Sequence, residues 1–311
     1  MGASKFIVYT HMTEGFSFQN GGTVVQYLLC KVLEEYGQIA RIYPNSNIRI
    51  PNSIFSKFYN NEFPIDDNCI VIYCEGTQGN PLNAPKVVRW MLSELGQNVP
   101  KAYLETWDKK ELVYYFNSEN KFYKEPEKIN HIFKLLNVLY INPYAKNVNP
   151  GFRTGCCYTI RKAFSIHKNI TYIHPTNSFE ITRDNNQMQC ISLFNKCKFF
   201  ISYDSLTFLT VIAALCGCIS VVYKVDGLSK QDWIKTTAAN EYLQFKGYDN
   251  LFGIAYGLED IPFAVNTLHM APQQWSNIAN YSKEKLVLPF INDMQMFENM
   301  TNTIQHNFYS E

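Results

Sequence analysis

The first half of the chain alternates short apolar runs with segments of helical hydrophobic spacing. The apolar runs predict strands at 5–10, 39–43 and 69–74, with further strand candidates at 102–106 and 112–116. Apolar residues at helical spacing predict helices over 23–36 and 86–95, which end at Gly37 and Gly96. Two successive strand–helix–strand units indicate a parallel sheet with both faces covered.

The pattern restarts after residues 140–151, which are rich in proline, asparagine and glycine, the composition of a linker. Strands are then predicted at 156–161, 170–174, 199–202, 219–223 and 252–256, and helices over 186–195 and 206–216. From Glu259 onward the pattern is mainly helical. We therefore predict an α/β protein of two Rossmann-like domains, residues 1–145 and 146–289.

The segment 199–223 gives the strongest indication of a ligand site. Its first strand stops at a polar cluster, Tyr203-Asp204-Ser205, and the helix that follows ends at Gly217. The loop and the exposed N–H groups of such a helix can bind an anion. Capping of the helix by Asp204 or Ser205 is a complete structural explanation, but one cap suffices, so the other side chain could bind a ribose or phosphate.

Composition and charge narrow the class of protein. The chain is 46% hydrophobic and 18% charged, as expected of a folded protein. Its 28 basic and 27 acidic residues form no basic run, which argues against nucleic acid as the main partner. Nine cysteines lack C-x-x-C spacing, and the chain shows neither a signal-peptide core nor a transmembrane stretch of about 18 apolar residues. We expect a reducing, cytoplasmic location.

A basic pair, Arg161-Lys162, follows the first predicted strand of the second half. A helix terminus contributes only about 0.3–1 kcal/mol towards binding an anion, so a diphosphate also needs a cation. Lys162 could supply that charge. The alternative is a solvated strand end, but the position of Lys162 in the same half as Asp204 favours binding.

The first half offers its own candidates. Gly21 and Gly22 begin a predicted helix and would let a ligand approach the backbone closely, although a flexible loop explains them equally well. They lack the full G-x-G-x-x-G pattern, which weakens a prediction of NAD binding. Glu75 follows a strand and is either a general base or a solvated loop charge. His11 and Glu14, after the first strand, compete for the same role.

Two further features bear on the chemistry. His174 ends a predicted strand of the second half, where binding or packing is a better explanation than catalysis. The chain contains neither an H-E-x-x-H nor an Asp-x-Asp motif. Sugar transferases that use a metal usually hold it through such a carboxylate pair, so no metal site is expected.

The chain resembles glycosyltransferases of the GT-B fold, in particular the family 4-like and rhamnosyltransferase-like enzymes of bacterial and viral polysaccharide assembly. The likeness covers nearly the whole chain and rests on Gly21-Gly22 and on residues 73–96, 153–163 and 201–223. It implies two Rossmann-like domains with parallel sheets that face a central cleft. It also implies an acceptor site on the first domain, a nucleotide-sugar donor site on the second, and a C-terminal helix over 290–311 that packs back on the first.

The resemblance further implies roles for single residues. Lys162 would neutralise the donor diphosphate, and Gly21-Gly22 would let a loop close over the donor. The remaining candidates for donor binding are Arg161, His174, Tyr203, Asp204, Ser205 and Thr207. A glycan hydroxyl would displace the nucleoside diphosphate without a metal or another cofactor. Many retaining members carry two glutamates here, but this chain has Asp204 and Ile212, so the stereochemical outcome and the nucleotide cannot be inherited.

Two other functions stay open at this point. The same fold would suit a nucleotide-sugar epimerase, which should bring more acidic and histidine residues together in its cleft. It would also suit a non-catalytic module that binds a nucleotide or a sugar. The donor sugar, the acceptor and the oligomeric state are not decided by the sequence.

Overall fold

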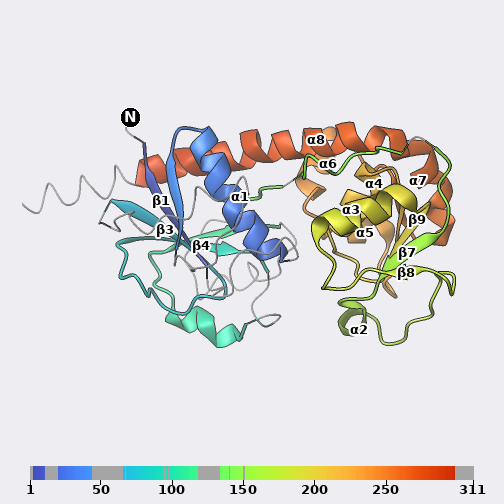
Figure 1. Ribbon diagram of the computed structural model, residues 1–311. Helices are drawn as coiled ribbons and strands as arrows, with labels where there is room; N and C mark the ends of the chain where they lie inside the picture. The colour runs from blue at the N-terminus through green and yellow to red at the C-terminus, as the bar shows by residue number, and fades with distance from the viewer. Residues whose placement is uncertain are drawn as a thin grey trace, which may run out of the picture. The chain divides into compact units, whose positions relative to one another are not determined.

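A computed structural model describes residues 3–10, 20–43, 66, 68–93, 96, 99–117, 134–139, 141–149 and 151–297. The chain divides into two compact units (Figure 1). The first contains residues 1–140 and 281–311, and the second contains residues 141–280. Both units are α/β and each has its own parallel sheet, as the sequence predicts. Residues 298–311 of the expected C-terminal helix lie outside the described residues.

The first unit is built on a six-stranded sheet with the order β2-β1-β3-β4-β5-β6, and every pair of neighbours is parallel. The strands are β1 (Lys5–Tyr9), β2 (Ile39–Tyr43), β3 (Cys69–Cys74), β4 (Lys86–Met91), β5 (Leu112–Tyr115) and β6 (Lys134–Leu135). The strand order reverses at β1, which lies between β2 and β3. Such a reversal is the topological switch point at which open parallel sheets bind ligands.

Helix α1 (Gly21–Glu35) follows β1 and confirms the predicted helix. Its N-cap is Asn20, whose side chain accepts the N–H of Thr23 at 3.2 Å. The helix ends at Gly37, where φ is +76° and the next N–H donates back to the Leu33 carbonyl at 3.0 Å. This left-handed termination is the Schellman arrangement that favours glycine.

The core of the first unit also contains residues that follow α8 (Ala271–Ser282) and a π-helical turn (Lys283–Val287). Phe290, Ile291 and Met294 are buried among α1 and the strands. The hydroxyl of Tyr114 on β5 donates to Asp293 at 2.7 Å, and Lys134 on β6 pairs with the same carboxylate. This helical segment is therefore part of the first unit, although it is far from the strands in sequence.

Two predictions for the first half are wrong. Residues 86–95 do not form a helix, because Lys86–Met91 form β4, which is buried along its whole length. A central parallel strand is covered on both faces, so its apolar run shows no alternation that distinguishes it from a buried helix. Residues 102–106 are part of a 3₁₀ helix (η2, Lys101–Thr106) rather than a strand. Pro100 precedes it and cannot donate to a strand ladder.

The second unit has a five-stranded parallel sheet with the order β11-β10-β9-β7-β8. Its strands are β7 (Cys156–Thr159), β8 (Phe179–Glu180), β9 (Phe199–Ser202), β10 (Ile219–Val222) and β11 (Ile254–Tyr256). Its helices are α2 (Ala163–Ile166), α3 (Gln187–Lys196), α4 (Leu209–Leu215), α5 (Lys230–Lys235), α6 (Asn240–Lys246), η4 (Leu258–Asp260), α7 (Ile261–Thr267) and η5 (Leu268–Met270), with most of α8. Helix α4 packs on β9 and β10, and α7 packs on β10 and β11.

The ends of α3 and α4 are fixed by one arginine. Arg153 donates to the carbonyl of Phe194 at 2.6 Å and to that of Cys216 at 2.7 Å. Gly217 ends α4 as predicted, with φ at +80°. A Cβ atom there would lie 2.6 Å from Nδ2 of Asn147, so this position also has no room for a side chain.

The strand predicted at 170–174 is absent. The N–H of Ile173 donates to the Tyr203 hydroxyl at 2.7 Å, and the N–H of Thr171 donates to the Tyr223 hydroxyl at 3.4 Å. Side chains thus take the hydrogen bonds that a strand would give to its neighbour. The edge position beside β7 belongs to β8 instead.

All nine cysteines are buried thiols, and the structure describes every one of them. Burial raises the pKa of Cys74, Cys156 and Cys190 to about 11 in each case. These thiols are therefore uncharged at neutral pH. Among the described helices, none combines the length and apolar character needed to cross a bilayer.

Candidate functional site

The second unit has its own switch point, between β7 and β9. The chain passes from β7 to the edge strand β8 and then returns to β9 on the other side of β7. Thr159 pairs with Ser202, and the N–H of Tyr203 donates to the Thr159 carbonyl at 3.0 Å. The segments that follow, 160–162 and 203–208, therefore leave adjacent strands at the same edge. Parallel α/β sheets bind ligands at this place.

The basic pair lies in the first of these segments. Lys162 is exposed, and its ammonium group has no partner among the residues that the structure describes. Its carbonyl accepts the hydroxyl of Ser165 at 2.7 Å, so backbone contacts fix the start of α2. Arg161 is half-buried. Its positive charge lowers the pKa of Cys190, whereas the burial of that thiol raises it. Of the two residues, Lys162 presents its charge to solvent.

The polar segment after β9 does not cap α4 in the predicted way. Helix α4 begins only at Leu209, and its N-cap position is Phe208, which makes no side-chain cap. Asp204 accepts the N–H of Leu206 at 3.1 Å, and the hydroxyl of Thr207 accepts the N–H of Leu209 at 3.3 Å. These two local turns keep the segment out of the helix, so the predicted capping by Asp204 or Ser205 is wrong.

Tyr203 is fully buried and serves as an internal hydrogen-bond hub. Its hydroxyl accepts the N–H of Ile173 and lies 2.9 Å from Nδ1 of His174. We infer that the hydroxyl donates to His174, because Nδ1 is the acceptor within reach of this O–H among the described residues. A neutral imidazole with Nδ1 as acceptor carries its proton on Nε2. Tyr203 thus fixes the tautomer of a residue that lies closer to the surface.

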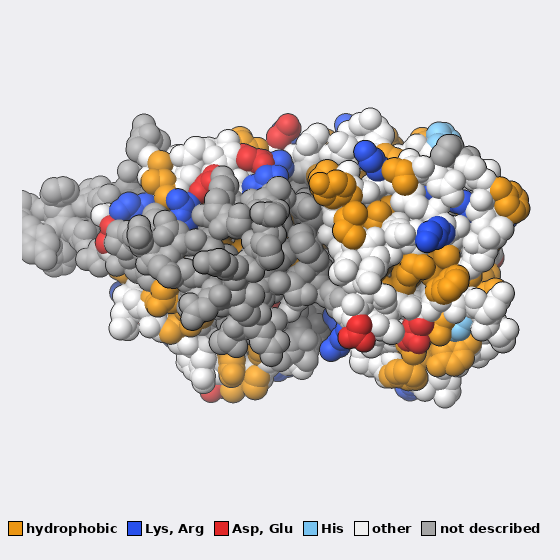
Figure 2. Space-filling model, viewed as in Figure 1, with side chains coloured by type: hydrophobic (Ala, Val, Ile, Leu, Met, Phe, Trp, Pro, Cys, Tyr) orange, Lys and Arg blue, Asp and Glu red, His pale blue; other side chains and the backbone are white. Residues whose placement is uncertain are grey.

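His174 belongs to an aromatic group at this edge. Its ring stacks on Tyr158 with centroids 3.6 Å apart and an interplanar angle of 9°, and the Tyr172 ring lies 5.3 Å away. Tyr172 is 54% exposed. Burial lowers the pKa of His174 below its usual 6.5, although the charge of Glu180 acts in the opposite direction. Figure 2 shows exposed hydrophobic side chains on the second unit, one group of them beside a histidine.

Replacement of Tyr203 by phenylalanine should change the titration of His174. The variant leaves the N–H of Ile173 and Nδ1 of His174 without their partner, at a cost of about 1–3 kcal/mol. Loss of the O–H donor also removes support for the neutral ring, so the pKa of His174 should rise. Nitrogen-15 NMR of the imidazole across pH measures both the tautomer and the pKa.

The lowered pKa of His174 makes the stability of the wild-type protein depend on pH. The contribution of His174 to the free energy of unfolding is complete above the unfolded pKa near 6.5 and is lost as the pH falls through the lower folded value. Tyr223→Phe is the matched control, since that hydroxyl contacts the backbone of Thr171 and not His174. An unchanged tautomer in Tyr203→Phe would contradict the assignment.

Gly21 and Gly22 form the first turn of α1 at the switch point of the first unit. A Cβ atom on Gly21 would meet nothing within 4 Å. One on Gly22 would lie 3.3 Å from the Asn20 side chain and 3.7 Å from Leu92. The open side of this turn is therefore at Gly21. The candidates His11 and Glu14 lie outside the described residues.

Glu75 follows β3 as predicted, but it is only 7% exposed. One carboxylate oxygen accepts the N–H of Leu92 at 2.9 Å, and the other accepts the hydroxyl of Ser93 at 2.6 Å. The carboxylate thereby holds the chain where it leaves β4. Its role as a general base stays a prediction.

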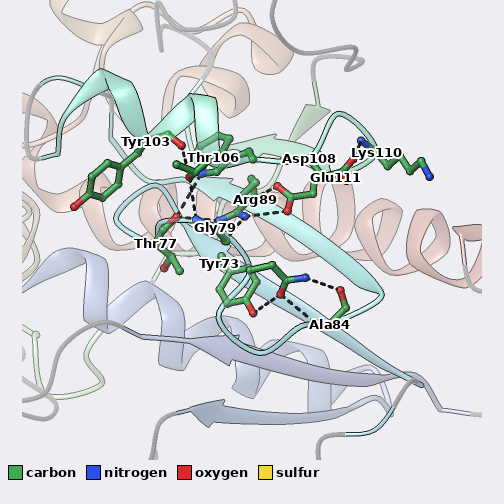
Figure 3. A network of polar contacts seen from close by, with 12 residues as sticks. Tyr73, Thr77, Gly79, Ala84, Arg89, Tyr103, Thr106, Asp108, Lys110 and Glu111 are labelled. Carbon is green, nitrogen blue, oxygen red and sulfur yellow. Dashed lines mark hydrogen bonds and ion pairs between the residues drawn. The ribbon is translucent and has the colours of Figure 1, made fainter.

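Sequence reasoning missed a buried ion pair beside this loop, between Arg89 of β4 and Glu111. Arg89 is fully buried and donates twice to the carboxylate, Nε at 2.7 Å and Nη2 at 2.9 Å. It also donates to the carbonyls of Thr77 at 3.0 Å and Gly79 at 2.6 Å (Figure 3). The guanidinium therefore fixes the loop that follows Glu75. A charge inside an apolar strand was the available signal, because such a charge requires a buried partner.

The described residues contain no group of three or more histidine, cysteine, aspartate or glutamate side chains that could hold a metal ion. The candidate residues that the structure describes fall into two sets, one at the switch point of each unit. A scan against protein-family models finds no match to this chain, and a search of curated proteins finds no similar sequence.

Proposed function

We propose that this protein is a metal-independent glycosyltransferase of the GT-B type. It would transfer a sugar from a nucleoside-diphosphate sugar to a hydroxyl of a glycan acceptor. The observation that carries the proposal is the placement of Lys162 and Asp204 at the ends of adjacent strands, at the switch point of a parallel sheet. The second unit would bind the donor, and the first unit would bind the acceptor.

The chemistry of the candidate residues supports a nucleotide as the ligand. A diphosphate favours a cation that is not already paired, and Lys162 provides one at this edge. The exposed ring of Tyr172 offers a stacking surface for a base. His174, with its proton on Nε2, offers a neutral donor to a carbonyl or phosphate oxygen.

The proposed reaction is a displacement at the anomeric carbon of the donor sugar. The acceptor oxygen forms the new bond, and the bond to the diphosphate oxygen breaks with its electron pair. Negative charge then develops on the leaving diphosphate, where Lys162 would stabilise it. The proton of the acceptor hydroxyl must pass to a base, for which Glu75, His11 and Glu14 are the candidates.

A second function, a non-catalytic module that binds a nucleotide or a sugar, is favoured by one observation. Both carboxylate oxygens of Glu75 already accept hydrogen bonds from Leu92 and Ser93. A carboxylate engaged in this way is a poorer base than one that faces an open site. The module would keep the donor site and lack turnover.

Thermal unfolding with a panel of nucleotides tests the proposal. UDP, GDP and TDP, each alone and as its sugar conjugate, should include at least one that stabilises the protein. A ligand at one hundred times its Kd contributes about 2.7 kcal/mol. The stabilising donor is then incubated with glycan acceptors, and release of the nucleoside diphosphate is measured. Stabilisation by no nucleotide would refute the glycosyltransferase, whereas binding without release would identify the module.

A further inference from the structure

A cavity of about 200 Å³ lies at the carboxyl ends of β10 and β11 in the second unit. Its walls include Lys224, Lys230, Tyr256, Glu259 and Asp260. At about 30 Å³ for each molecule of liquid water, the space corresponds to roughly seven waters. It is smaller than the clefts of roughly 300–1,000 Å³ that bind drug-sized ligands. The cavity therefore has room for a single small ring rather than a whole nucleotide.

The charges around this cavity are balanced by two ion pairs. Lys230 contacts Asp260 at 2.6 Å, and each of these side chains is 18% exposed. Lys224 pairs with Glu259, and both are more exposed. Asp260 also accepts the N–H of Tyr256 at 2.9 Å, which ties its carboxylate to the end of β11. The two ammonium groups and two carboxylates give the walls no net charge.

Gly257 makes room for the outer ion pair. Its φ is +89°, a conformation that disfavours every residue with a side chain. A Cβ atom at this position would lie 2.7 Å from Oε2 of Glu259 and 2.7 Å from Cε of Lys224. The side chains of both residues therefore cross directly over the backbone of Gly257. A side chain at this position would require the ends of Lys224 and Glu259 to move aside.

One layer of aromatic rings connects this cavity to the segment that follows β9. The indole of Trp233 donates to the carbonyl of Ser205 at 2.8 Å. The same indole stacks on Tyr256, with ring centroids 5.0 Å apart and an interplanar angle of 14°. Tyr256 in turn lines the cavity. Trp233 and Tyr256 thus link the cavity to the segment that follows β9 and contains Asp204.

We infer that this cavity holds the sugar ring of the donor and selects a sugar without a charge. This inference rests on the proposed function and names the substrate class for it. Sugar hydroxyls can donate to Glu259 and Asp260 and accept from Lys224 and Lys230 without separation of either ion pair. An acidic or basic sugar would bring a charge that has no opposite charge left to meet it.

Calorimetric titration with free and sugar-linked nucleotides tests this assignment. The probes are UDP with UDP-glucose and UDP-glucuronic acid, GDP with GDP-mannose, and TDP with TDP-rhamnose. The double variant Lys224→Met/Glu259→Gln should weaken binding of the neutral nucleotide sugar at least tenfold and change binding of the free nucleotide less than twofold. The control is Lys5→Met/Asp66→Asn. It removes a partly exposed ion pair in the first unit, at the amino ends of β1 and β3.

A second variant tests the charge rule directly. Glu259→Lys should shift the preference from UDP-glucose towards UDP-glucuronic acid at least tenfold, because it leaves a positive charge without a partner. Unchanged affinity for the neutral nucleotide sugar in the double variant, with nucleotide binding intact, would overturn the sugar assignment alone. Equal loss of free and sugar-linked nucleotide would also overturn it. If the wild-type protein binds no nucleotide, the proposed function fails and the assignment fails with it.

Discussion

Replacement of Arg89 by methionine should destabilise the first unit by about 3–5 kcal/mol, the usual loss when one partner of a buried ion pair is removed. The variant leaves the Glu111 carboxylate with no opposite charge, at a position that is only 7% exposed. It also removes the donor to the carbonyls of Thr77 and Gly79. We therefore expect the loop that follows Glu75 to lose its order together with the loss of stability.

Urea unfolding followed by tryptophan fluorescence measures this effect. Trp107 is a suitable reporter, because its ring lies 4.8 Å from the guanidinium carbon of Arg89. The double variant Arg89→Met/Glu111→Leu is the control and should recover most of the stability, since it leaves no buried charge behind. Arg89→Lys should recover little, because an ammonium group cannot reproduce the two-pronged contact. A loss below about 1 kcal/mol in Arg89→Met would contradict this account.

Replacement of Lys162 by alanine should weaken binding of the donor nucleotide about 10- to 100-fold. A hydrogen bond to a charged group contributes about 1.5–3 kcal/mol, which corresponds to that range of affinity. The fold should be unaffected, because the ammonium group has no partner among the described residues and is exposed. Titration calorimetry with the nucleotide that stabilises the wild-type protein measures the change.

Lys168→Ala is the matched control for Lys162→Ala. Lys168 is also exposed and lies shortly after α2, so its removal changes the net charge equally but spares the switch point. The wild-type affinity should fall with added salt more steeply than that of Lys162→Ala, because the variant has lost a screened contact. Equal affinities for Lys162→Ala and the wild-type protein would remove the cation from the proposed diphosphate site.

The sequence predicted the fold well wherever local signals were strong. Strands β2, β3 and β9 have the predicted bounds, because each is a short, mainly apolar run that stops at a proline or at polar residues. Gly37 and Gly217 end their helices in the left-handed conformation that glycine adopts readily. The segments predicted to bind a ligand were those that directly follow strands, because the carboxyl ends of parallel strands lie at one edge of the sheet.

The errors concern features that tertiary contacts decide. A pattern of apolar residues cannot separate β4 from a helix, because only its neighbours on both sides of the sheet determine its conformation. The pairing of Arg89 with Glu111 joins residues 22 positions apart, and no local pattern predicts it. Likewise the hub role of Tyr203 depends on the backbone of a loop that precedes it in the chain, so its hydroxyl could not be assigned in advance.

The buried cysteines provide each unit with a chemical reporter of its own opening. Three of them, Cys30, Cys69 and Cys74, belong to the first unit, and the other six belong to the second. A thiol reagent can reach a buried sulfur only during transient unfolding of the structure around it. The rate of modification at each cysteine therefore measures how often that part of the chain opens. Mapping the modified cysteines by mass spectrometry would rank the two units by their opening free energies. The experiment needs neither a sequence variant nor added denaturant.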